Sequence, residues 1–191
     1  MANIFSKYSN MTIEETNLKG CFVLSPKVIF DKRGSFFESF NQISFEKLTG
    51  LNVNFVQDNE SFSSKGVLRG LHYQIGKFAQ AKLVRVINGK VLDIAVDIRK
   101  NSPTFGHHIA IELSEENKKQ FFIPRGFAHG FVVLSDTAIF SYKCDNFYNK
   151  ASEGGIIFSE PTLNIDWRLQ KKQLIISEKD FNLPTLENAR I

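Results

Sequence analysis

The sequence is poor in cysteine and in long apolar runs, and each shortage excludes a class of protein. Only two cysteines occur among 191 residues, Cys21 and Cys144, and neither belongs to a pair with metal-ligand spacing. We expect both to be buried thiols, because disulfides are rare in a reducing compartment. No apolar run approaches the roughly 20 residues that span a bilayer, so no membrane is expected. The N-terminus lacks the apolar core of a signal peptide, which predicts a cytoplasmic location.

Charge of one sign and nucleotide-binding glycine motifs are also scarce. The net charge is only +4, from 24 basic and 20 acidic residues. Basic runs such as Lys118-Lys119 and Lys171-Lys172 are no longer than two residues, whereas a nucleic-acid binder needs a dense basic stripe. The chain has no G-x-S-x-G, no phosphate-cradling G-x-x-x-x-G-K-[ST] and no dinucleotide G-x-G-x-x-G. Nucleic-acid binding and these nucleophile or dinucleotide chemistries are therefore not expected.

Phenylalanine is abundant, with 19 copies, and aromatic residues favour β structure. Two alternating runs within 81–100 flank Asn88-Gly89, which predicts a β-hairpin with a type I′ turn. One short helix is expected in "QISFEKLTG", closed by Gly50. We predict one all-β domain over 1–191, a jelly-roll barrel with few short helices. The other short β-like runs are 22–30, 35–40, 53–57, 106–113, 120–123, 130–134 and 138–144.

Polar groups interrupt several β faces that otherwise read as core. In "GVLRGLHYQ" the alternation of a strand puts Leu68, Gly70, His72 and Gln74 on one face. Any single intrusion is more often a satisfied core residue or a solvated edge than a functional group. Several in separate strands of a small barrel instead predict a ligand pocket in its mouth. The four intruding residues are His72, Lys82, His129 and Tyr142.

The histidines do not predict a metal site. His107 and His108 are adjacent and point to opposite faces of a strand. "PRGFAH", 124–129, matches half of a metal-binding cupin pattern, but the His-x-His and carboxylate of the other half are missing. Histidine, tyrosine and lysine in a β pocket are instead suited to proton transfer beside a carbonyl, with lysine stabilising an enolate oxygen.

The chain closely resembles the dTDP-4-dehydrorhamnose 3,5-epimerases, the RmlC-like branch of the cupin jelly rolls. The similarity runs from about Thr12 to about Phe181. Residues 1–11 precede the usual start of the family and are expected to be a flexible leader, or Met11 an alternative initiation site. The resemblance rests on "DKRGSFFESF" (31–40), "FVQDNESFSSKGVLRGLHYQ" (55–74), "AQAKLVRVINGKVLDIAVDIRKNSPTFG" (79–106), "PRGFAHGFVVLSDTAIFSYKCDNFY" (124–148) and "SEKD" (177–180).

The resemblance implies an isomerase that inverts carbons 3 and 5 of dTDP-4-dehydro-6-deoxy-D-glucose, without metal or coenzyme, in dTDP-rhamnose biosynthesis. It implies that His72 is the general base, that Asp180 orients it, and that Tyr142 is the acid on the other face of the sugar. Lys82, with His129, would bind the keto oxygen. A homodimer is implied, with exchanged N-terminal strands and "DKRGSFFESF" reaching the partner's cleft. The residues implied to line the nucleotide-sugar cleft are Arg33, Glu38, Gln57, Asp58, Asn59, Arg69, Glu153 and Lys179, with Tyr148 stacking on thymine.

Simpler interpretations of these residues remain open at this point. Ser177-x-x-Asp180 also fits a helix capping box, Arg33 also suits a turn, and Glu38, Glu153 and Tyr148 also suit a solvated surface. The alternative functions are a related epimerase that inverts one carbon and a non-catalytic jelly roll that binds a nucleotide sugar. A base, an orienting carboxylate and an acid together favour the enzyme, because a binding protein has no need of all three.

Overall fold

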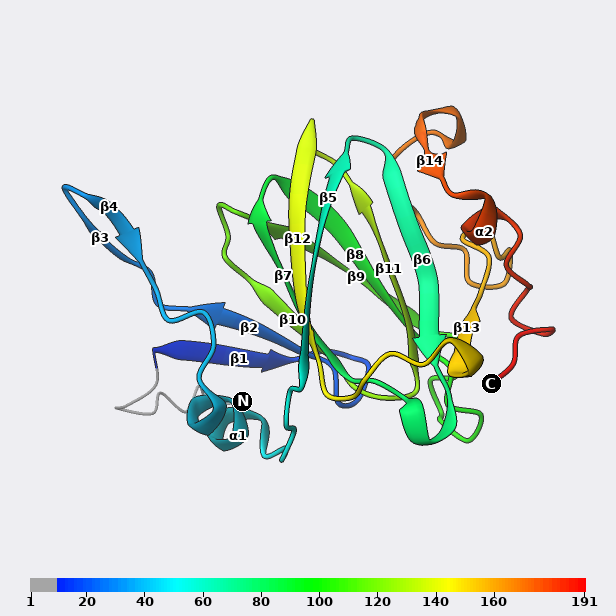
Figure 1. Cartoon of the computed structure of the whole chain (residues 1–191), viewed down its shortest axis with the longest axis horizontal. Helices are drawn as coiled ribbons and strands as arrows, with labels where there is room; N and C mark the ends of the chain where they lie inside the picture. Colours follow the sequence, from blue (N-terminus) through cyan, green and yellow to red (C-terminus); the bar gives the residue numbers. More distant parts are fainter. Residues whose placement is uncertain (1–9) are drawn as a thin grey trace.

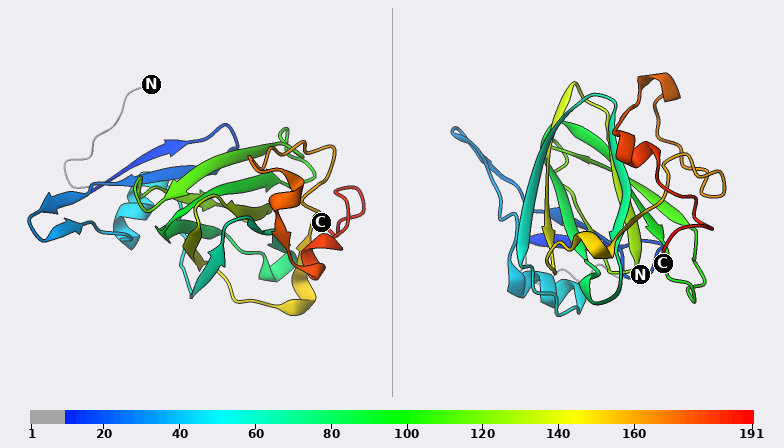
Figure 2. Two further views of the ribbon diagram at one scale, coloured as in Figure 1. Left: turned by 90° about the horizontal axis from the view of Figure 1, so that it is seen from above. Right: turned by 45° about the vertical axis from the view of Figure 1, so that its right-hand side comes forward.

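The computed structural model describes residues 10–191, which form two antiparallel sheets facing each other and a separate hairpin (Figures 1 and 2). The first sheet has the order β1-β2-β10-β7-β12-β5 and the second β13-β6-β11-β8-β9, with β14 parallel to β6 at its edge. This is the predicted jelly roll. The strands are β1 (Met11–Glu15), β2 (Phe22–Pro26), β3 (Ile29–Asp31), β4 (Gly34–Phe36), β5 (Gln57–Ser64), β6 (Val67–Gln74), β7 (Lys82–Asn88), β8 (Lys90–Asp97), β9 (His108–Ser114), β10 (Gln120–Ile123), β11 (Phe127–Val133), β12 (Thr137–Cys144), β13 (Glu153–Gly155) and β14 (Ile175–Ile176).

Helices are few and short, as predicted: α1 (Gln42–Thr49), α2 (Glu178–Phe181) and the single 3₁₀ turns η1 (Gly76–Phe78), η2 (Lys150–Ser152) and η3 (Lys171–Gln173). The expected helix is confirmed as α1. Asn41 caps its first turn by accepting the N–H of Ser44, and Gly50 ends it in the left-handed region at φ 70°. Within residues 10–191 no helix is long and apolar enough to cross a membrane.

Apolar side chains form three clusters that account for the layers. The space between the sheets is filled by residues such as Val84, Phe131 and Phe140. The outer face of the second sheet is covered by the C-terminal segment, with Phe158 and Trp167 buried against it. Helix α1 covers the outer face of the first sheet near β2, β7 and β10. The second sheet is thus buried on both faces, which fixes where polar groups can reach solvent.

The predicted hairpin across Asn88-Gly89 is wrong. Strand β7 pairs with β10 and β12, whereas β8 pairs with β9 and β11, so the turn carries the chain from one sheet to the other. The type I′ turn is also wrong, because it needs positive φ at both central residues and only Gly89, with φ 81°, has it. The turn does not decide which strands pair, and β8 joins the sheet in which both of its apolar faces are covered.

Three further expectations differ from the structure because apolar alternation does not require strand pairing. The run expected at 35–40 is a strand only as far as Phe36, in β4. The segment 22–30 divides into β2 and β3. The strand expected at 53–57 is absent, and β5 begins only at Gln57. Val53 and Phe55 alternate because both pack into the cluster around Phe45 of α1. The two cysteines are free and buried, as expected.

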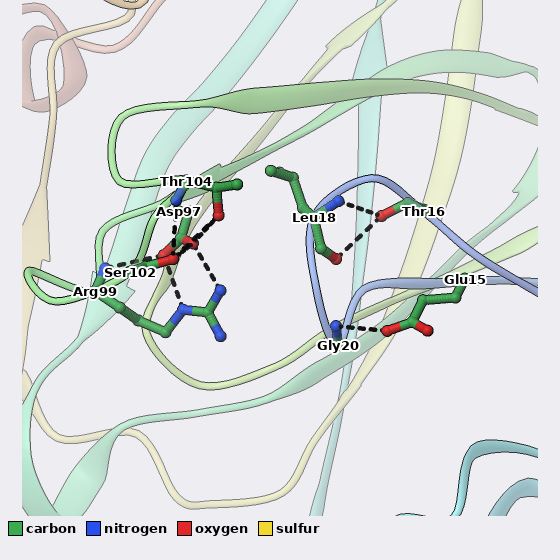
Figure 3. A network of polar contacts seen from close by, with 8 residues as sticks. All are labelled: Glu15, Thr16, Leu18, Gly20, Asp97, Arg99, Ser102 and Thr104. Carbon is green, nitrogen blue, oxygen red and sulfur yellow. Dashed lines mark hydrogen bonds and ion pairs between the residues drawn. The ribbon is translucent and has the colours of Figure 1, made fainter.

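The loop after β8 is tied down by one buried carboxylate (Figure 3). Asp97 accepts hydrogen bonds from Arg99 Nη2 at 2.6 Å, from Ser102 Oγ at 2.6 Å and from Thr104 Oγ1 at 2.7 Å. Burial alone raises the pKa of Asp97, but these donors more than reverse that effect and hold the pKa well below its ordinary value. This network is structural and lies against the β1–β2 turn around Leu18.

A bulge in β6 sets the direction of the two polar side chains of "GVLRGLHYQ". In the pairing of β6 with β11, His72 lies opposite His129 and Arg69 lies opposite Phe131. The two positions are three residues apart on β6 but two apart on β11, so β6 contains one extra residue between them. Arg69 and His72 therefore face the interior cavity together. The expectation that Leu68 shares the face of His72 is wrong, since Leu68 packs into the outer cluster.

We expect Gly70→Ala to destabilise the protein strongly. A Cβ at Gly70 would lie 2.6 Å from Gly130 Cα and 2.8 Å from the His129 carbonyl oxygen, both backbone atoms of the paired strand β11. Forcing β6 and β11 apart should cost roughly 1–3 kcal/mol of unfolding free energy beyond the backbone strain. Gly34→Ala is the matched control, because Gly34 has nearly the same φ, 129° against 130°, with nothing within 4 Å. Urea unfolding that gives equal losses for the two variants would contradict this packing argument.

Candidate active site

A cavity of about 410 Å³ opens between the facing sheets and receives all four residues that interrupt apolar strands. Strands β5, β7 and β12 of the first sheet, β6 and β11 of the second, and helix α2 contribute its wall. Polar side chains dominate the lining, which also includes two phenylalanines. The lining residues are Asn59, Glu60, Ser61, Arg69, His72, Lys82, His129, Phe131, Phe140, Tyr142, Ser177, Lys179 and Asp180.

His72 is hydrogen-bonded to Asp180, which lies 108 positions further along the chain. Its Nε2 lies 2.7 Å from Asp180 Oδ1, and Asp180 Oδ2 accepts the backbone N–H of Gly70 at 3.1 Å. The N–H of Asp180 donates to Ser177 Oγ at 3.1 Å, so the helix cap and the His–Asp pair coexist. Burial raises the pKa of Asp180, but the contacts with His72, Gly70 and Ser177 outweigh it and lower the pKa below its ordinary value. The carboxylate is therefore ionised, and His72 Nε2 carries the donated proton.

A second His–Asp pair lies deeper in the same cavity. His129 Nε2 is 2.9 Å from Asp93 Oδ2, and these side chains are 7% and 0% exposed. Burial lowers the pKa of His129 and raises that of Asp93, and their mutual attraction offsets each shift only in part. Sequence reasoning missed Asp93. The available signal was an acid facing the same side of β8 as Val91 and Ala95, which both pack between the sheets.

Lys82 and Tyr142 face the two histidines from the first sheet. The Lys82 ammonium lies 5.9 Å from the centroid of the Tyr142 ring, and no ion pair among residues 10–191 engages it. Burial lowers the pKa of Lys82, with partial compensation from Cys144, Asp93 and Glu153. Burial also raises the pKa of Tyr142, which keeps its hydroxyl protonated at neutral pH. A cation and a proton donor thus lie opposite a histidine that can accept a proton.

Several predicted cleft residues lie at the cavity rim. Arg69 donates to Ser63 Oγ at 3.1 and 3.2 Å, and the Asn59 amide contacts Cys144 Sγ at 3.7 Å. Outside the cavity lining, Glu153 accepts from Lys179 Nζ at 2.7 Å and from the Tyr148 hydroxyl at 3.4 Å.

Four of the predicted residues lie away from the cavity of their own chain. Arg33 forms an ion pair with Asp31 on the projecting β3–β4 hairpin. Glu38 accepts from Asn41, and Asp58 pairs with Lys143. Gln57 does not line the cavity. Its side chain donates a hydrogen bond to Asn59 Oδ1 at 3.0 Å and accepts one from the Tyr148 N–H at 3.1 Å.

Ser61 is a further cavity residue that sequence reasoning missed. Its Oγ is buried, and among residues 10–191 it is the one buried side-chain nitrogen or oxygen without a hydrogen-bond partner. Such a group is costly unless something satisfies it. No sequence signal separated Ser61 from the other small polar residues of "NESFSS".

The residues of the cavity fit acid–base chemistry better than metal ligation. Across residues 10–191 no three histidine, cysteine, aspartate or glutamate side chains gather to hold a metal ion. Each histidine instead contacts one carboxylate, which orients the ring and stabilises its protonated form. The fold and the site together define a cupin-type jelly roll whose cavity groups are suited to proton transfer.

Comparison with known proteins identifies the family. Residues 15–188 match the family described as dTDP-4-dehydrorhamnose 3,5-epimerase. The enzyme of that name from Shigella flexneri is 54% identical over 90% of this chain and 94% of its own. The crystal structure of the one from Elizabethkingia anophelis superposes with a TM-score of 0.90 at 58% identity, covering 94% of this chain and 98% of the other. That of the Legionella pneumophila enzyme in complex with dTDP-4-keto-L-rhamnose has a TM-score of 0.90 at 49% identity, covering 93% and 94%. The chain belongs to the dTDP-4-dehydrorhamnose 3,5-epimerase family.

We expect Asp180→Asn to reduce the dependence of the free energy of unfolding on pH under acidic conditions. Because the folded-state pKa of Asp180 is lowered, its contribution to stability is complete above the unfolded value of about 4 and is lost as the pH falls through the folded pKa. The variant should therefore unfold more easily at neutral pH and lose less further stability on acidification below about pH 4. Asp136→Asn, on the exposed β11–β12 turn, should retain the wild-type slope. Chemical unfolding across this range measures both, and parallel slopes for wild type and Asp180→Asn would contradict the assignment.

Proposed function

We propose that this chain converts dTDP-4-dehydro-6-deoxy-D-glucose to dTDP-4-dehydro-L-rhamnose by removing and returning protons at carbons 3 and 5. The observation that carries the proposal is the presence of the His72–Asp180 pair and Tyr142 in facing sheets around one cavity. Two relatives at 49–58% identity over nearly the whole chain carry the corresponding names. The alternative functions, inversion of one carbon or binding alone, predict different exchange behaviour.

His72 is the base in this mechanism. Its Nε2 proton is held by Asp180, which leaves Nδ1 free to take the proton next to the keto group. The electron pair of the broken C–H bond moves to the keto oxygen and forms an enolate. Lys82, with His129, supplies positive charge or a hydrogen bond at that oxygen.

Tyr142 is the acid. Its hydroxyl gives a proton to the same carbon from the opposite face, which inverts the centre, and the tyrosinate and the imidazolium then return to their starting states by exchange with solvent. Carbon 5 undergoes the same sequence, since it also flanks the keto group. No oxidant, metal or coenzyme enters these steps.

Substrate binding is assigned to the rim of the cavity. Arg69 and Lys179 supply cations for the diphosphate, and Asn59 and Glu153 supply polar contacts. Glu38, like Arg33, is assigned to the cleft of the partner, whereas Asp58 pairs with Lys143 and receives no contact with substrate. Tyr148, which is 56% exposed, stacks on the thymine. Gln57 positions Tyr148 by accepting a hydrogen bond from the backbone N–H of that tyrosine. The free thiols of Cys21 and Cys144 are consistent with a cytoplasmic enzyme.

We further assign the active form to a homodimer with exchanged N-terminal strands. The β3–β4 hairpin projects from the body and carries Ile29, Phe30 and Phe36, which are 52%, 77% and 70% exposed (Figure 1). Exposed apolar side chains on a projecting element are typical of an interface. In such a dimer Arg33 would line the partner's cleft, although it lies away from the cavity of its own chain.

We expect Tyr142→Phe to separate proton exchange from inversion. The His72 base remains, so the substrate should still exchange its protons in deuterated water, while inversion slows by about 10²–10⁴-fold at the carbon nearest the missing hydroxyl. His72→Asn should abolish exchange and inversion together and leave dTDP affinity near the wild-type value. Proton NMR follows both events in one sample and shows which carbons take up deuterium. Undiminished inversion in Tyr142→Phe would assign Tyr142 a packing role.

Mixing two inactive variants tests the exchanged dimer. In a cleft built from two chains, one chain supplies His72 and its partner supplies Arg33. Arg33→Ala and His72→Asn therefore remove groups that come from different chains. Mixed dimers then contain one cleft with both residues intact, and subunit mixing should restore about a quarter of wild-type activity. Each variant alone is the control. If the mixture shows only the average of the two activities, Arg33 acts within its own chain or not at all.

A further inference from the structure

We infer that Arg190 is a positioning residue that fastens the substrate-binding rim of the cavity from outside. Its Nη2 donates to the carbonyl oxygen of Ala151 at 2.6 Å and lies 3.4 Å from that of Glu153. These two carbonyls belong to η2 and β13, the segment that follows Tyr148. Arg190 lies beyond residues 15–188, which match the family, so the family resemblance assigns it no role.

Arg190 is firmly anchored although its guanidinium is exposed. Ala189 and Ile191 on either side of it pack against the apolar cluster on the outer face of the second sheet. Its own carbonyl accepts the hydroxyl of Tyr73 at 3.0 Å, and Tyr73 is 4% exposed on β6. The ring of Tyr73 lies against Gly154, where no Cβ fits. The segment 151–155 is therefore held between a buried tyrosine and the arginine that this tyrosine anchors.

The segment held by Arg190 carries groups of the proposed binding site. Glu153 lies within it and contacts both Lys179 and Tyr148 through its carboxylate. Tyr148 precedes it and is fixed at its other end by buried Gln74, which accepts the Asn149 N–H at 2.6 Å and donates to the Phe147 carbonyl at 3.2 Å. Strand β13 stays paired with β6 when the arginine is removed. The variant loses only the hydrogen bonds to the Ala151 and Glu153 carbonyls, which orient the end of the segment that bears Glu153. The end next to Tyr148 stays attached to Gln74.

The base and the acid do not depend on this contact. His72 lies on β6 and Tyr142 on β12, and Asp180 is held by His72, Gly70 and Ser177. Loss of Arg190 should therefore weaken substrate binding and leave the rate at saturation unchanged. Binding that is weaker in the ground state and the transition state alike raises KM without lowering kcat.

Calorimetric titration with dTDP, together with steady-state kinetics, tests the inference, which rests on the proposed function. Arg190→Ala should weaken dTDP binding by about 3- to 10-fold, the equivalent of one or two ordinary hydrogen bonds, with KM raised to a similar extent. Tyr73→Phe keeps the packed ring and removes only the bond to the Arg190 carbonyl, so it should weaken binding in the same direction. Arg190→Lys should recover part of the affinity.

Arg168→Ala is the matched control, because Arg168 is also an exposed arginine but pairs with Glu112, away from this segment. It should bind dTDP as the wild type does. Wild-type affinity in both Arg190→Ala and Tyr73→Phe would overturn the inference, as would a fall in kcat as large as the loss of affinity. If Arg190→Ala fails to fold, Tyr73→Phe decides alone. Failure of the wild type to bind dTDP would instead overturn the proposed function, and that result is visible without any variant.

Discussion

The site depends on one carboxylate, that of Asp180, which joins the C-terminal part of the chain to the centre of the barrel. It accepts one hydrogen bond from the His72 ring and another from the Gly70 backbone, while its own N–H is capped by Ser177. A buried carboxylate is stable only when it is paired and hydrogen-bonded. The same contacts that stabilise Asp180 in the interior also set the tautomer of His72, so docking of α2 orients the proposed base.

Beside that carboxylate, two glycines let β6 and β11 approach each other closely. Gly70 lies against Gly130, and a side chain at either position would collide with the backbone of the facing strand. The bulge at this point turns Arg69 and His72 to the same side and presents the Gly70 N–H to Asp180. Gly70 and Gln74 stand where a metal-binding cupin pattern has ligands. In this chain Gly70 permits the close approach of β6 to β11. The Gln74 side chain is hydrogen-bonded to the backbone of Phe147 and Asn149.

Sequence reasoning succeeded where the signal was local or independent of strand partners. The helix at α1 and the meeting of His72, Lys82, His129 and Tyr142 in one cavity follow from capping chemistry and from polar residues on apolar faces. It failed where the outcome depended on which strands meet. The change of direction at Gly89 was recognised, but the type of turn and the strand pairing were not. The alternation rule could not foresee the bulge at Gly70. Asp93 was missed because an acid beside an apolar stripe usually faces water, whereas β8 is covered on both sides.

The two His–Asp pairs of the cavity have the same chemistry but different access to solvent, and this difference separates their roles. His72 is 31% exposed and His129 only 7%. A base that works on two carbons in succession must release its proton to water between steps, which a residue at the cavity mouth can do and a buried one cannot. Burial lowers the pKa of His129, which favours a neutral ring with a fixed orientation, suited to holding an oxygen rather than to carrying protons. The difference in exposure therefore supports the proposed roles, with proton removal by His72 and with His129 and Lys82 at the keto oxygen.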